Sequence, residues 1–290
     1  MHLPAATFAL LAASFLLPTG LLAQERLLQP EDLPARRTAA AVLGFGVASW
    51  RELGPEAGGE RLVAAIATAR QCLPDGSSAR VVADELAARH ADASTVRATK
   101  ALIADLTFEP LAEAALPEGL PGFQALDELE LRHYPGYRMV RTGMKGGTMG
   151  AFWPLFTHIK EHEIAMTTPV QIDYGQQGER LREVSMAFLY GSPALGEAGA
   201  DGKVEVVDVP ATVVLTIGSR GYDRPARVAE LRARIDAWLA QHPEWQAAGE
   251  MRTMGYNSPS VAAERRYFEV QLPVQPRQAA KPGCNVRESV

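Results

Sequence analysis

The chain has 290 residues, of which 47% are hydrophobic and 22% are charged, and its net charge at pH 7 is −5. This composition is ordinary for a soluble globular protein, and the length allows one large domain or two modest ones. The basic residues are interspersed with acidic residues along the chain instead of forming a basic stripe. We therefore predict no nucleic-acid partner, because a nucleic-acid surface requires clustered positive charge.

The first segment of the chain is apolar and carries no Asp, Glu, Lys or Arg between residues 3 and 23. It ends abruptly at Gln24, directly after the small residue Ala23. We predict that residues 1–23 are a secretory signal peptide and that the mature protein is exported, either to the periplasm or out of the cell. The alternative is an uncleaved N-terminal membrane anchor, because the apolar run is about the length that spans a bilayer. No second such run follows, so no stable membrane span is expected after cleavage.

Residues 26–108 are rich in Ala, with apolar residues at helical spacing; one example is Leu62, Ile66, Ala69 and Leu73. This pattern predicts a small α-helical region of short helices. It does not indicate which protein, if any, binds to them. Residues 109–123 contain several Pro and Gly residues and are predicted to be a linker.

The segment from residue 124 to residue 274 begins with an alternating pattern. Leu129, Leu131 and His133 share one face of a predicted strand, and the polar residues between them take the other face. A Pro-Gly turn, a second strand and an amphipathic helix near 149–161 follow. The segment 164–172 is then predicted to be a strand, in which Pro169 favours an edge position or a bulge.

The same order of elements repeats in the second half of this segment. Strands are predicted at 204–207 and 212–217, a helix at 225–241, and closing strands at 251–256 and 265–272. We therefore predict an α+β fold in which two ββαββ halves form a distorted antiparallel β-barrel flanked by two helices. The small helical region precedes this barrel, and residues 275–290 form a C-terminal tail.

Four sequence motifs within this body resemble the SOUL family of heme-binding proteins. They are Leu-Glu-Leu-Arg-His-Tyr at 129–134, Ile-Ala-Met-Thr-Thr-Pro-Val at 164–170, Gly-Tyr-Asn-Ser-Pro at 255–259 and Arg-Arg-Tyr-Phe-Glu-Val at 265–270. The last motif has one residue more than the family pattern between the arginines and the glutamate. The motifs occur in the family's order and leave the N-terminal helical region uncovered.

The resemblance implies a barrel that holds heme or a related porphyrin as a non-catalytic ligand, for sequestration or transfer, and a protein that is not an enzyme. One alternative remains open, because the same two-unit architecture resembles effector-binding domains. These domains take varied apolar, often cationic, small molecules without heme.

His133 is the candidate axial ligand to the heme iron. A neutral imidazole on an apolar face can ligate iron, and some SOUL-type proteins have His in this Arg-His-Tyr context. Many relatives lack it and are thought to hold the tetrapyrrole through apolar contacts alone, so a half-buried structural histidine is the competing interpretation. Leu129, Leu131, Met166 and Met186 are the candidate pocket lining.

Residues 158–162 match the H-x-x-E-H pattern of some zinc hydrolases, with Glu161 as the base. His158 and His162 can share a helix face, but the helix is short and no later helix offers a convincing third carboxylate ligand. We therefore keep zinc hydrolysis as a remote alternative and do not expect these histidines to bind metal. The two cysteines, Cys72 and Cys284, either form one disulfide or remain two separate thiols.

Overall fold

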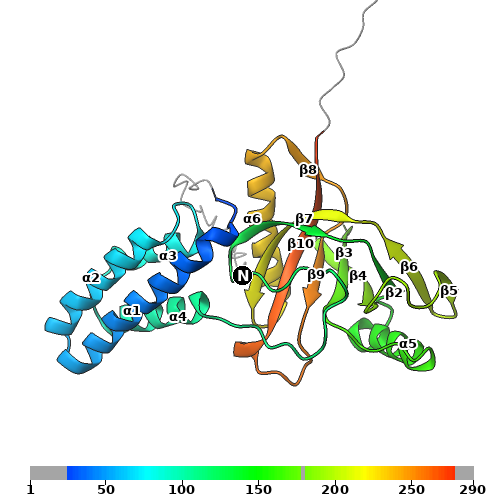
Figure 1. Ribbon diagram of the computed structural model, residues 1–290, viewed down its shortest axis with the longest axis horizontal. Helices are drawn as coiled ribbons and strands as arrows, with labels where there is room; N and C mark the ends of the chain where they lie inside the picture. The colour runs from blue at the N-terminus through cyan, green and yellow to red at the C-terminus, as the bar shows by residue number, and fades with distance from the viewer. Residues whose placement is uncertain (1–24, 178–179, 278–290) are drawn as a thin grey trace, which may run out of the picture.

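The computed structural model describes residues 25–177 and 180–277 (Figure 1). The predicted signal peptide at 1–23 and Cys284 lie outside these residues, whereas Cys72 is half-buried at the end of a helix. Among the helices of the described residues, none combines the length and the apolar character that a membrane crossing requires.

The N-terminal helical region is confirmed. After a short 3-10 helix at Pro30–Asp32, it contains α1 (Leu33–Leu53), α2 (Ala57–Cys72), α3 (Ser78–Ala87) and α4 (Ala93–Leu106). The side chain of Ser77 accepts a hydrogen bond from the amide of Arg80 and caps α3, and Asp92 caps α4 through the amide of Thr95. These helices share a core of their own around Leu43, Leu62 and Ile66, and Figure 1 shows them gathered on one side of the sheet.

The remaining elements form one antiparallel sheet with two further helices. The strands are β1 (Leu129–Tyr134), β2 (Tyr137–Gly143), β3 (Val170–Gln177), β4 (Arg180–Leu189), β5 (Gly199–Asp201), β6 (Val204–Val209), β7 (Thr212–Arg220), β8 (Trp245–Ala247), β9 (Arg252–Gly255) and β10 (Tyr267–Pro276). The helices are α5 (Gly147–Glu161) and α6 (Pro225–Gln241), and a 3-10 turn occupies Ala263–Arg265. Both helices coincide closely with the predicted ranges 149–161 and 225–241.

The strand order reveals an approximate twofold relation between two halves. Within the described residues the order is β1-β7-β10-β9-β3-β4-β2-β6-β5, and β8 pairs with β10. If β1, β2, β3 and β4 are exchanged with β6, β7, β9 and β10, the order from β1 to β6 reads the same backwards. The first strand of each half therefore pairs within the other half, and β3 meets β9 at the centre.

The antiparallel sheet is confirmed, but the predicted distorted barrel does not close: within the described residues the path of paired strands has two ends, β1 and β5. At the first end the free side of β1 is occupied by the N-terminal segment, where Leu27 forms a parallel bridge to Leu129. At the other end β5 has only three residues, and all of them are exposed. One edge of the sheet is thus covered and the other is short. Both features limit pairing with strands of other chains, although the sheet is not closed.

The main apolar core lies on one face of this sheet. Leu155 and Ile159 of α5 and Leu231 and Ile235 of α6 pack there against side chains of the strands. Their spacing of four residues places each pair on one side of its helix.

The interpretation of Pro169 also needs correction. The strand predicted to begin at residue 164 begins at Val170, and the Thr168–Pro169 peptide is cis. Because β3 pairs with both β4 and β9, Pro169 precedes a central strand and lies neither on an edge nor in a bulge. The irregularity in β3 falls at Asp173 and Tyr174 instead.

The opposite face of the sheet is also buried, and it carries polar side chains among apolar ones. Glu269 has no exposed surface and accepts hydrogen bonds from the hydroxyls of Tyr134 (3.1 Å) and Tyr267 (2.9 Å). The segment 109–123, expected to be a linker, packs over this face: Leu120 contacts a cluster around Tyr134, and Phe123 lies 5.1 Å from Tyr256 between ring centroids. The hydrogen bonds to Glu269 satisfy its carboxylate and so make its burial tolerable.

Candidate functional site

His133 lies at the end of β1, on the same face as Leu129 and Leu131. The register pairs it with Val213 of β7. Leu129 is wholly buried and Leu131 is half-buried against the main core, but His133 is exposed. The alternating pattern therefore predicted correctly which face of β1 carries His133. The apolar core on that face includes Leu129 and Leu131 but does not extend to the imidazole of His133.

The exposed His133 ring forms part of the wall of a groove of about 490 Å³. The other lining residues come from the β1–β2 turn, the start of β7, and the segments around β8 and the end of β10: Tyr134, Pro135, Ala211, Thr212, Val213, Ala248, Val274, Gln275 and Pro276. Most of these side chains are apolar or small, so the groove offers one imidazole nitrogen on a mainly apolar wall.

The predicted lining residues lie elsewhere. Leu129 and Met186 are buried in the main core, and Leu131 and Met166 pack partly buried against it. None of the four lines the groove at His133. These four residues thus belong to the main core of the domain, and other side chains line the groove beside His133.

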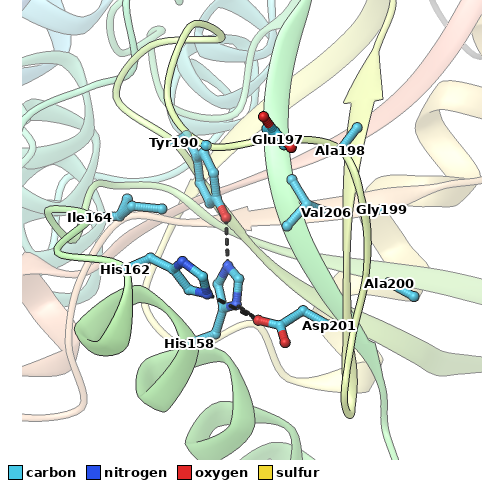
Figure 2. A pocket seen from close by; sticks show the side chains of 11 residues that line it. His158, His162, Ile164, Tyr190, Glu197, Ala198, Gly199, Ala200, Asp201 and Val206 are labelled. Carbon is cyan, nitrogen blue, oxygen red and sulfur yellow. Dashed lines mark hydrogen bonds and ion pairs between the residues drawn. The ribbon is translucent and has the colours of Figure 1, made fainter.

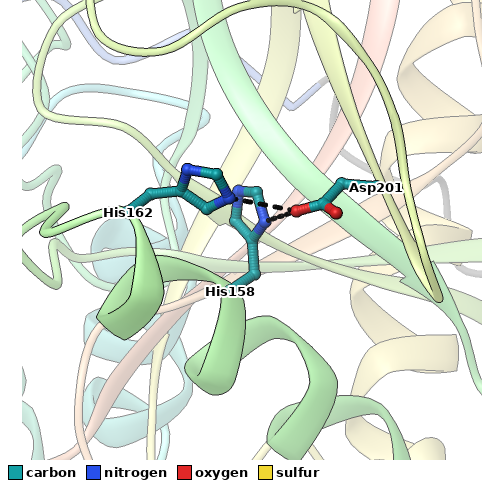
Figure 3. A group of neighbouring side chains, drawn as sticks. All are labelled: His158, His162 and Asp201. Atoms are coloured by element: carbon teal, nitrogen blue, oxygen red, sulfur yellow. Dashed lines mark hydrogen bonds and ion pairs between the residues drawn. The ribbon is translucent and has the colours of Figure 1, made fainter.

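A second group of chemically active side chains gathers at the C-terminal end of α5 (Figure 3). His158 and His162 are one helical turn apart, and both face Asp201 of β5. His158 Nδ1 lies 2.7 Å, and His162 Nε2 3.1 Å, from Asp201 Oδ2. The side chain of His158 is 5% exposed, whereas those of His162 and Asp201 are about half exposed.

Tyr190, the residue directly after β4, contacts the other side of the buried imidazole (Figure 2). Its hydroxyl lies 2.7 Å from His158 Nε2. Hydrogen bonds from His158 and then His162 lower the pKa of the Asp201 carboxyl, and burial raises the pKa of the Tyr190 phenol. A cavity of about 420 Å³ adjoins the group and is lined also by Ile164, Val206 and the segment 196–200.

Sequence reasoning found the two histidines but missed Asp201 and Tyr190. The Asp201-Gly202 pair is a hairpin signal, and Gly202 does adopt a φ of 59° between β5 and β6. The sequence does not reveal that this hairpin lies against α5, because the contact depends on the pairing of β6 with β2. Glu161, the base in the remote zinc-hydrolase alternative, is exposed and is not part of the three-residue group.

Both sites lie in the part of the chain that matches a known family. Residues 121–273, just over half of the chain, match the family described as SOUL heme-binding protein. The chain belongs to the SOUL family. His133, His158, His162 and Asp201 all fall within the SOUL match, and the helical region precedes it.

Solved structures show only a distant likeness to this SOUL protein. The C-terminal domain of EcmrR is 13% identical, with 52% of this chain and 98% of that chain covered and a TM-score of 0.42. An uncharacterized conserved protein from Listeria innocua is 12% identical, with 52% and 93% covered and a TM-score of 0.41. SAV2435 bound to tetraphenylphosphonium is 10% identical, with 51% and 94% covered and a TM-score of 0.33. No curated protein matched the chain. The family assignment therefore rests on the sequence match.

Proposed function

We propose that this SOUL protein binds heme or a related porphyrin as a non-catalytic ligand, for sequestration or transfer. The observation that carries the proposal is the position of His133, which belongs to the family's opening motif and stands on the wall of an open, mainly apolar groove. An imidazole in such a place can serve as an axial ligand for heme iron.

The residues of the groove fit a flat apolar ligand. Pro135, Val213, Val274 and Pro276 supply apolar surface beside His133. Burial of a macrocycle against such surface contributes roughly 25 cal/mol per Å². When bound, heme would supply an iron centre whose absorption reports its ligands, and His133 would supply the axial nitrogen.

Titration of the purified full-length protein with hemin, followed by absorbance in the Soret region, tests this proposal. We expect saturation at one hemin per chain. Ala248→Trp, which fills the groove, should weaken binding, whereas Ala64→Trp on the exposed surface of α2 should not. Hemin binding that both variants retain equally would place the ligand elsewhere, and no saturable binding by the wild type would refute the proposal.

A general small-molecule binding domain is the second candidate. It is favoured by the absence of Lys and Arg among the groove-lining residues that the structure describes, so that the carboxylates of a porphyrin would have to point to solvent. The same groove suits a neutral or cationic apolar ligand equally well. Saturable binding of tetraphenylphosphonium, with none of hemin, would favour this candidate.

We also propose that the protein is exported after cleavage of residues 1–23, on the evidence of their apolar, uncharged sequence. N-terminal sequencing of protein from a secreting host should give a start at or near Gln24. Recovery of the chain in the membrane fraction with Met1 retained would support the anchor instead.

A further inference from the structure

We propose that His158, His162 and Asp201 form a binding site for a divalent transition-metal ion of the zinc class. The three side chains come from two elements, the end of α5 and the β5–β6 hairpin, and they converge on one point (Figure 3). This site is distinct from the groove at His133, and the proposal does not depend on tetrapyrrole binding.

The distances between the ligand atoms suit a small ion. One nitrogen of each histidine and one oxygen of Asp201 all lie within 4.8 Å of one another. Tetrahedral zinc, with bonds of about 2.0–2.1 Å, places its ligand atoms about 3.3 Å apart. The contacts of 2.7 Å and 3.1 Å to Asp201 Oδ2 are slightly shorter, so an ion requires a small outward movement of the carboxylate.

Two features allow that movement. Asp201 belongs to a three-residue exposed strand and is followed by Gly202 at positive φ. His162 is the C-terminal cap residue of α5, and its side chain is about half exposed. Both ligands can therefore adjust, whereas the buried His158 provides a fixed point.

Tyr190 supplies the orientation that such a site needs. Histidines that bind metals use their second ring nitrogen in a hydrogen bond, which fixes the ring and its tautomer. When His158 Nε2–H donates to the Tyr190 hydroxyl, the lone pair on Nδ1 points at the position between the three ligands (Figure 2). Since His158 and Tyr190 are almost wholly buried, this orientation exists before an ion arrives.

The chemistry of the three ligand atoms, two imidazole nitrogens and one carboxylate oxygen, determines which ions the site would prefer. Two imidazoles and one carboxylate suit zinc, cobalt or nickel, whereas magnesium and calcium prefer oxygen ligands throughout. Three protein ligands leave coordination positions for water or a small ligand, and the cavity of about 420 Å³ beside the group provides the space. The competing interpretation is a hydrogen-bond network in which both histidines donate N–H groups to Asp201.

Competition of the purified, tag-free full-length protein with a chromogenic zinc chelator separates these interpretations. We expect one zinc ion per chain. His162→Ala and Asp201→Asn, which each remove one ligand, should weaken zinc binding tenfold or more, and Tyr190→Phe should weaken it by about tenfold, as is common for residues that orient a ligand. His158 is left intact because truncation of a buried side chain disturbs packing.

The matched control is His242→Ala. His242 also pairs with a carboxylate, with Nδ1 at 3.0 Å from Glu244 Oε1, but it is not part of the group. His242→Ala and His133→Ala should retain wild-type zinc affinity. A wild-type protein that binds no stoichiometric zinc, or binding that His162→Ala and Asp201→Asn both leave unchanged, would overturn the metal site and leave the hydrogen-bond network.

Discussion

Arg36 of α1 and Glu128, the residue before β1, form an ion pair whose side chains are only 4% and 1% exposed. The Glu128 carboxylate also accepts hydrogen bonds from the amides of Ser78 (3.0 Å) and Ala79 (3.2 Å), the first two residues of α3. An acidic group at this position is stabilised by the positive end of the helix. One carboxylate thus joins two helices of the N-terminal region to the sheet.

Glu128→Gln should therefore destabilise the protein strongly. It leaves the Arg36 charge buried and uncompensated, which typically costs about 3–5 kcal/mol of unfolding free energy. Urea unfolding followed by circular dichroism measures this change. The control is Arg141→Met, which breaks the exposed pair with Glu205 and should cost no more than about 1 kcal/mol. Equal losses in the two variants would contradict the role given to burial.

Glu130 should make stability depend on pH. Burial raises its pKa from 4.5 to about 7, with Glu269 and Glu128 adding to the rise and Arg132 opposing it. Because the folded state holds this proton more tightly, the contribution is fully present below pH 4.5 and is lost as pH rises through about 7. A shift of this size corresponds to roughly 3 kcal/mol.

Glu130→Gln should remove this dependence. Relative to the wild type, the variant should gain unfolding free energy between pH 5 and pH 8, by up to roughly 3 kcal/mol. Urea titrations of both proteins at a series of pH values measure the difference, and the titration of all other groups cancels in the comparison. A difference that stays constant over this range would show that Glu130 is ionised in the folded protein throughout.

His133→Ala should change the spectrum of bound hemin more than its affinity. Loss of an axial nitrogen should shift the Soret maximum and alter the spin state, while apolar contacts keep the affinity within about tenfold, roughly 1.4 kcal/mol. Absorbance titration with hemin measures both quantities. His162→Ala, which truncates a half-exposed histidine far from the groove-lining residues in sequence, should leave the spectrum of bound hemin unchanged. An unchanged spectrum in His133→Ala would remove the ligand role and leave a porphyrin groove without it.

Gly218→Ala should destabilise the sheet. A Cβ atom there would lie 2.5 Å from the Tyr267 hydroxyl oxygen and 2.8 Å from Gln124 Cγ, both of which are buried. Overpacking of this kind costs about 1–3 kcal/mol. Thermal and urea unfolding should show the loss, whereas Gly122→Ala, where a Cβ meets nothing within 4 Å, should be nearly neutral.

The positions of α5 and α6 could be predicted because each helix has a regular apolar stripe and begins at a Gly or a Pro. Leu155 and Ile159, like Leu231 and Ile235, lie in the main core as their spacing indicates. The repeated order of elements likewise indicated two halves. In each case the information is local, within one helix or one pair of strands.

The polar face of the sheet could not be predicted, because alternation alone treats polar residues as solvent-facing. Glu128 and Arg132 follow that pattern in the sequence, yet Glu128 is buried by the N-terminal helices and Arg132 reaches Glu269 beneath the segment 109–123. The role of Asp201 could not be predicted for a related reason. The β5–β6 hairpin lies against α5 only because β6 pairs with β2. Contacts between segments distant in sequence carry no periodic signal.

The exchange of first strands between the halves has a consequence for how the chain folds. During synthesis β1 emerges long before β7, its hydrogen-bonding partner, and β2 likewise precedes β6. Neither half can complete its sheet alone, so β1 and one edge of β2 remain without their hydrogen-bonding partners until β6 and β7 have been synthesised. Such non-local pairing slows folding and exposes strand edges to aggregation in the meantime. A truncation after β4 should thus yield insoluble chains and not a smaller domain.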